Sequence, residues 1–127
     1  MIGVNRMACM KIDVLGTKYT IRRVNSGQDE FMDKMSFGGY CDDTKKEIVV
    51  LNMNSIEAWK DEPEHVILAK ERETIRHELI HAFLSESGLA WNSFAAEKAW
   101  AKNEEMVDWF AIQFPKLLQA FKSADAL

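Results

Sequence analysis

The residues with the clearest chemical potential form one five-residue stretch, His77-Glu78-Leu79-Ile80-His81, which has the pattern HExxH. In an α-helix, side chains four residues apart lie on the same face one turn apart, so the two imidazoles can bind one ion. Neutral imidazole is a good ligand for Zn²⁺, and a neighbouring carboxylate can take a proton from zinc-bound water. The stretch therefore predicts a zinc site with His77 and His81 as ligands and Glu78 as general base.

The segment around this stretch is typical of one long helix, from about residue 63 to Ser87. Pro63 suits its first turn and Gly88 suits its C-terminal cap. At about 100° per residue, the apolar side chains fill a broad arc opposite the histidines and are expected to face the core. They are Leu68, Ile75, Leu79, Ile80, Ala82, Phe83 and Leu84. A five-residue match also arises by chance on helix surfaces, so a catalytic zinc site requires a third protein ligand elsewhere.

A second helix, predicted from about Phe94 to Phe114, can supply the third ligand. Glu104 borders its apolar stripe, whereas Glu105 points away from it. The stripe contains Trp100, Met106, Val107, Phe110, Ala111 and Phe114. Asp108 lies one turn beyond Glu104 and can accept the ring N–H of a zinc-bound histidine, which fixes the tautomer. We predict Glu104 as the third ligand and Asp108 as the orienting residue, although either carboxylate alone is also typical of a solvated helix edge.

The rest of the chain predicts strands before these helices. Residues 11–15 and 18–24 alternate apolar and polar side chains around a turn, as do residues 40–42 and 47–52, so we expect two β-hairpins. Residues 29–35 suit a short helix or an irregular cover, and residues 1–10 a frayed leader. Strands followed by helices predict an α+β fold, with a twisted and mostly antiparallel sheet. Pro115 is expected to interrupt the second helix, before a last helical stretch to about Ser123.

Composition limits the classes of function. A chain of 127 residues with 47% apolar and 28% charged residues suits one globular domain, residues 1–127. The net charge of −4 argues against general nucleic-acid binding, and no apolar run approaches the roughly 20 residues of a membrane span. The N-terminal part has no continuous apolar segment of the secretory type, and Cys9 and Cys41 lack a disulfide-framework spacing. We therefore expect reduced thiols and a cytoplasmic location.

Together the motifs resemble a known class. HELIH, followed by Glu104 and then Asp108 four residues later, resembles the gluzincin zinc metallopeptidases, in which a glutamate ligand and an ExxxD arrangement follow HExxH. Residues 104–111 are similar to the ImmA/IrrE-type metallopeptidases associated with phage-repressor control, and to small phage-encoded proteins identified as metallopeptidases. The ImmA/IrrE type usually has Asn at the position of Asp108. The metzincin pattern does not match, because its glycine and third histidine fall on Leu84 and Ser87.

The resemblance covers about residues 75–115 and implies a minimal zincin domain: a zinc-dependent peptidase, phage or prophage encoded, that acts on a peptide or protein. It also implies that residues 47–52 lie near the cleft as a strand along which a peptide binds extended. Tyr40 and His65 are candidates for the oxyanion helper of larger gluzincins, though each is more often structural or exposed. The rival hypothesis is a non-catalytic zincin-fold module that binds a partner protein, and a coincidental HExxH is a third.

Overall fold

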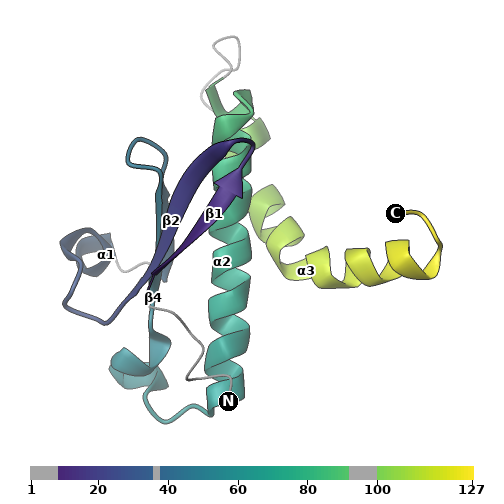
Figure 1. Cartoon of the computed structure of the whole chain (residues 1–127). Coiled ribbons are helices and arrows are strands. Elements are labelled where there is room, and N and C mark those ends of the chain that lie inside the picture. The colour runs from purple at the N-terminus through teal and green to yellow at the C-terminus, as the bar shows by residue number, and fades with distance from the viewer. Residues whose placement is uncertain (1–8, 36–37, 92–99) are drawn as a thin grey trace.

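The computed structural model of the chain describes residues 9–35, 38–91 and 100–127. Its strands are β1 (Cys9–Val14), β2 (Thr17–Val24), β3 (Gly39–Asp42) and β4 (Glu47–Leu51). Its α-helices are α1 (Glu30–Met35), α2 (Glu64–Glu86) and α3 (Glu104–Ser123), and short 3-10 helices include η4 (Leu89–Trp91) and η5 (Trp100–Lys102). A sheet followed by helices confirms the predicted α+β fold (Figure 1).

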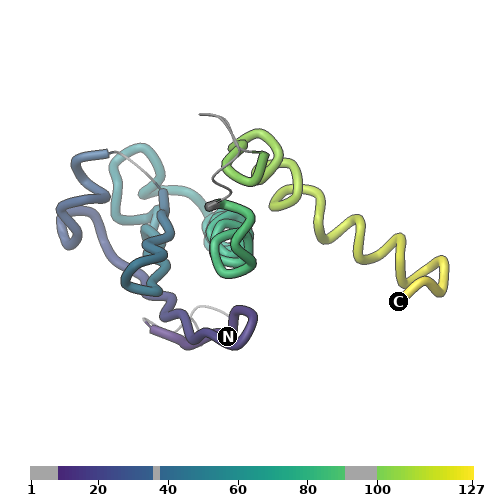
Figure 2. The backbone as a smooth tube through the Cα atoms, turned by 90° about the horizontal axis from the view of Figure 1, so that it is seen from above, coloured from purple at the N-terminus to yellow at the C-terminus, as the bar shows by residue number. Residues whose placement is uncertain are grey.

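The elements form layers, and α2 is the central one. Seen from above, α2 lies between the sheet and the first part of α3 (Figure 2). The core between the sheet and α2 consists of Val14, Tyr19, Ile21, Ile48, Val50 and Ala82, with Ile75 and Leu79 packed against it. A second cluster on the other side of the sheet contains Val24, Met32, Val49 and Leu51. Because α2 packs along the sheet, the helix that carries both histidines is anchored by the main core.

Both predicted hairpins are present. β1 pairs with β2 and β3 pairs with β4, each antiparallel. The β1–β2 turn needs positive φ at two successive positions, and it has them at Leu15 (51°) and Gly16 (90°). The predicted frayed leader is wrong for Cys9 and Met10, which belong to β1, while residues 1–8 lie outside the described part of the chain.

The prediction of a mostly antiparallel sheet is wrong, because the sheet is mixed. The strand order is β1-β2-β4-β3, and β2 runs parallel to β4. The chain leaves β2, passes through α1 and β3, and returns beside β2, and such a crossover is how two strands of one chain become parallel neighbours. β4 is therefore an interior strand, and Ile48, Val49 and Val50 are fully buried. The expectation that a peptide lies along residues 47–52 is therefore also wrong, because both edges of β4 are already paired.

The prediction for α2 is confirmed at both ends. It follows Pro63 and ends just before Gly88, which has a φ of 86°. Within the predicted apolar arc, Ala82 is buried but Phe83 is 42% exposed, because the sheet covers only part of that arc. None of the described helices is both long and apolar enough to cross a membrane.

The second helix differs from its prediction. α3 begins at Glu104, where the side chain of Asn103 caps it by accepting a hydrogen bond from the Met106 amide (2.8 Å). The predicted residues 94–99 lie outside the described part of the chain. The expected interruption at Pro115 is wrong, because α3 continues through Pro115 to Ser123. Its C-terminal part extends away from α2 and the sheet in both views (Figures 1 and 2).

A glycine lets the edge strand β3 approach α2 closely. A Cβ atom at Gly39 would lie 2.6 Å from Cγ2 of Thr74 and 3.1 Å from the Val49 carbonyl oxygen. Real Cβ atoms do not make contacts this short, so a larger residue would require either Thr74 or β3 to shift. The same hypothetical atom would be 3.6 Å from Cγ of Glu78. Gly39 therefore places the sheet edge directly beside the HExxH face of α2.

Candidate metal centre

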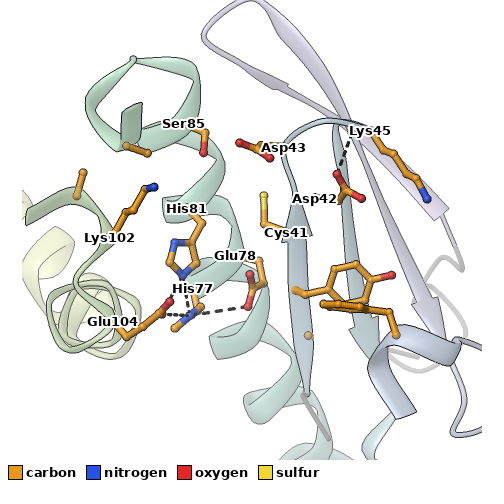
Figure 3. A pocket seen from close by; sticks show the side chains of 15 residues that line it. Cys41, Asp42, Asp43, Lys45, His77, Glu78, His81, Ser85, Lys102 and Glu104 are labelled. Carbon is orange, nitrogen blue, oxygen red and sulfur yellow. Dashed lines mark hydrogen bonds and ion pairs between the residues drawn. The ribbon is translucent and has the colours of Figure 1, made fainter. Parts of the chain in front are cut away.

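Three predicted ligand atoms meet where α2 faces the start of α3 (Figure 3). Nε2 of His77 and Nε2 of His81 are 3.1 Å apart. Oε1 of Glu104 lies 3.2 Å from the first nitrogen and 3.0 Å from the second. The structure thus brings together the three residues that were predicted as ligands, which lie on two separate helices.

The donor set fits a zinc ion in type and spacing. In a tetrahedral site with bonds of about 2.0–2.1 Å, two ligand atoms are about 3.3 Å apart. The three atoms of His77, His81 and Glu104 form a triangle with sides of 3.0–3.2 Å, close to one face of such a tetrahedron. Two imidazole nitrogens and a carboxylate oxygen with an open fourth position are the ligands of a catalytic rather than a structural zinc site.

Asp108 occupies the position expected of an orienting residue. Its Oδ1 lies 2.7 Å from Nδ1 of His77. In a neutral imidazole, Nδ1–H donates to this carboxylate, which leaves the lone pair on Nε2. That lone pair then faces a carboxylate oxygen and a second imidazole nitrogen, an arrangement that a bound cation would suit. The contact therefore favours a metal-binding tautomer of His77.

Glu78 is the buried acid of the site. With His77 and His81 it forms a group that could hold a metal ion. It is 7% exposed, and its Oε1 is 3.8 Å from Nε2 of His77. Burial raises the pKa of Glu78 to about 7; the negative charges of Glu104 and Asp108 act in the same direction, while His77 opposes them. A carboxyl group with a pKa near 7 is suited to exchange protons at neutral pH.

The candidate metal centre opens onto a cleft of about 910 Å³ between β3, α2 and η5 (Figure 3). The lining includes several polar residues that sequence reasoning did not select, namely Asp42, Asp43, Lys45, Ser85 and Lys102. No motif marks them, because they come from a hairpin, a helix and a 3-10 turn that only the tertiary structure brings together. Cys41 also lines the cleft as a free thiol, and burial raises its pKa to about 12.

Of the two candidates for an oxyanion helper, one has its hydroxyl bonded elsewhere and the other does not line the cleft. Tyr40 lines the cleft, but its hydroxyl donates a hydrogen bond of 2.8 Å to Asp29. Burial and this hydrogen bond raise the pKa of Tyr40 to about 12. His65 is exposed in the first turn of α2, three turns before His77.

No known protein family, curated protein or solved structure matches this chain significantly. The resemblance to gluzincins and to the ImmA/IrrE type therefore stays a prediction carried by the motif, and the site is interpreted from its own geometry.

The positions of the acidic residues predict how each contributes to metal affinity. Asp108→Ala should lower zinc affinity by about 10–100-fold, because His77 loses the acceptor that fixes its tautomer. Glu105→Ala removes an equally acidic, exposed residue of the same helix turn and should leave affinity nearly unchanged. Competition with a chromophoric chelator measures both constants. Equal losses for the two variants would contradict this orientation of α3.

The raised pKa of Glu78 predicts a pH-dependent stability in the metal-free protein. The folded state keeps the proton up to about pH 7, whereas the unfolded chain releases it near 4.5, so the free energy of unfolding falls as the pH rises through this window. Glu78→Gln removes this loss. The stability of the variant relative to wild type should increase by about 3 kcal/mol between pH 4 and pH 8.

Urea unfolding of both metal-free proteins at the two pH values measures this difference. His77, Glu104 and Asp108, which face Glu78, are the same in both proteins, so the comparison isolates the substitution at Glu78. A difference that does not change with pH would show that Glu78 ionises normally.

Proposed function

We propose that this protein is a zinc-dependent metallopeptidase in which His77, His81 and Glu104 hold the ion. The observation that carries the proposal is the triangle of three ligand atoms, 3.0–3.2 Å apart, with a buried carboxylate beside it. The zinc ion, when bound, would make its water acidic and would stabilise negative charge on a peptide carbonyl oxygen.

The chain's own residues supply the proton handling. Glu78 lies within reach of the open side of the triangle and, once ionised, can accept a proton from attacking water. Its buried carboxyl can then give that proton to the leaving amine. Asp108 holds the His77 ring in one orientation throughout, because its carboxylate remains bonded to Nδ1. The buried Glu78 thus transfers protons, whereas the exposed Asp108 orients His77.

An extended peptide is the substrate that the cleft suits best. β3 is an edge strand of the sheet and lines the cleft with its residues from Gly39 to Asp42. The Leu51 amide donates to the Gly38 carbonyl (2.9 Å). In an antiparallel pair, successive residues direct their main-chain N–H and C=O groups alternately toward and away from the partner strand, so those of Tyr40 face β4. Those of Gly39 and Cys41 face the free edge. A peptide that pairs there as an added strand passes beside the metal centre.

The test is cleavage of a diverse peptide library by the zinc-loaded protein, with products identified by mass spectrometry. The proposal expects cleavage that a chelator abolishes and added zinc restores. Products that persist in the chelated protein would come from a contaminating peptidase. Zinc-loaded protein that cleaves no peptide in the library would contradict the proposal.

One observation favours a second candidate, a zincin-fold module that binds a partner without cleaving it. The hydroxyl of Tyr40 is already bonded to Asp29, and His65 lies away from the cleft, so neither candidate is placed to assist an oxyanion. For this alternative, peptide should be retained by β3 without hydrolysis, and zinc would only stabilise the domain.

A further inference from the structure

Pro115 leaves a backbone acceptor of α3 without its usual partner. In a continuous α-helix the carbonyl oxygen of Ala111 accepts the N–H of residue 115, and proline has none. The proline ring also crowds that carbonyl and normally bends or breaks the helix. Ala111 is 1% exposed, so this oxygen is poorly placed to find solvent as a substitute.

Arg76 supplies the missing donor from the neighbouring helix. Its Nε donates a hydrogen bond of 2.6 Å to the Ala111 carbonyl oxygen. The bond is charge-assisted and joins α2 to the main chain of α3 at the point where the proline interrupts the hydrogen-bond ladder. This explains how α3 passes through Pro115 and stays helical.

The Arg76 contact belongs to a series of three that joins the two helices. Arg76 meets Ala111, His77 meets Asp108, and His81 meets Glu104. Residue numbers rise along α2 as they fall along α3, so the three contacts share one antiparallel register. The other two contacts consist of metal-site residues. Only the first sets the register without using a ligand or its orienting acid.

We propose that Arg76 is a positioning residue of the metal centre: by replacing the hydrogen bond that Pro115 removes, it holds α3 where Glu104 and Asp108 meet the two histidines. A shift of α3 by one residue moves each side chain by about 1.5 Å along the axis and about 100° around it. Metal–ligand distances tolerate only about 0.2 Å. The proposal rests on the zinc site of the proposed function but not on peptide hydrolysis.

The experiment is a double-mutant cycle on Arg76 and Pro115, read out as zinc affinity. Arg76→Met keeps the aliphatic stem but removes the donor, and should weaken zinc binding by about 10-fold. Pro115→Ala restores the N–H of residue 115, so Arg76→Met in that background should weaken binding by less than about 3-fold. Arg72→Met, at an exposed arginine one turn earlier in α2, is the matched control and should change affinity by less than about 2-fold.

Two further readouts separate positioning from general damage. Arg76→Lys keeps a cationic donor and should recover part of the affinity lost in Arg76→Met. The Co²⁺-substituted Arg76→Met protein should show a shifted visible absorption band, because a displaced Glu104 alters the coordination, while the double variant should regain the wild-type band. If Arg76→Met alone does not fold, Arg76→Lys and the Pro115→Ala background carry the comparison.

Equal losses with and without Pro115→Ala, or an unchanged affinity in Arg76→Met, would overturn the positioning role while leaving the zinc site intact. Absence of zinc uptake by wild type would overturn the metal centre and the positioning role together. Failure to cleave peptides would affect only the proposed peptidase activity. The three outcomes are therefore distinguishable.

Discussion

Glu78→Gln is expected to abolish peptide hydrolysis while zinc stays bound. The amide has nearly the same shape as the carboxylate but cannot accept the proton of attacking water, and loss of a positioned general base typically costs about 10²–10⁴ in rate. His77, His81 and Glu104 are unchanged, so zinc affinity should remain close to that of wild type. Side-by-side measurement of kcat/KM and zinc affinity for both proteins tests this separation.

Glu105→Gln is the matched control, since it makes the same chemical change at an exposed position of α3. It should leave both activity and zinc affinity unchanged. A Glu78→Gln protein that keeps full activity would mean that another group takes the proton. Equal peptide retention by wild type and Glu78→Gln, without cleavage by either, would favour the binding module instead.

His81→Ala is expected to remove most of the zinc affinity, with a loss larger than the one predicted for Asp108→Ala. Nε2 of His81 lies 3.1 Å from Nε2 of His77 and 3.0 Å from Oε1 of Glu104, so its removal leaves only two of the three proposed protein ligands. Wild type at a zinc concentration 100 times Kd should gain about 2.7 kcal/mol in its free energy of unfolding. His81→Ala should gain almost nothing.

The control is His65→Ala, which removes an exposed histidine from the first turn of the same helix. It should retain the full zinc-dependent stabilisation. Thermal unfolding with and without added zinc measures this stabilisation in wild type, His81→Ala and His65→Ala. Stabilisation of His81→Ala to the wild-type extent would place the binding site elsewhere in the chain.

Local patterns were enough to predict much of this fold. The ends of α2 follow from Pro63 and Gly88, and both hairpins follow from alternation around short turns, because such features depend on neighbouring residues. Helical geometry places Glu104 and Asp108 one turn apart on one side of α3, but their position beside the histidines also requires α2 and α3 to pack together. For these residues, the antiparallel packing of α2 and α3 is the only part of the arrangement that helical geometry does not supply.

The contacts between local elements were less predictable. Pairing of β2 with β4 joins residues about 27 apart, such as Thr20 and Glu47, and no turn motif specifies it. A signal was present, since the unbroken apolar run Ile48-Val49-Val50-Leu51 is typical of an interior strand buried on both faces. A strand paired on both sides cannot offer a free edge to a substrate.

α3 shows why a local rule can fail. The effect of Pro115 on the helix is offset by Arg76, which is 39 positions away in the sequence and becomes visible as a donor only when α2 and α3 are in contact. The apolar stripe was also predicted as buried, yet Phe110 and Phe114 are 37% and 47% exposed. Only Val107 and Ala111 are buried, because α3 leaves α2 after its first turns.

The most direct test of the central claim is the coordination of zinc in the reconstituted protein, measured by anomalous diffraction from a crystal at the zinc absorption edge. We expect one ion per chain, with Nε2 of His77, Nε2 of His81 and a carboxylate oxygen of Glu104 at about 2.0–2.2 Å. A fourth, non-protein ligand should face the cleft. A crystal grown with zinc that shows no anomalous peak between α2 and α3, or a peak bound by other residues, would contradict the account.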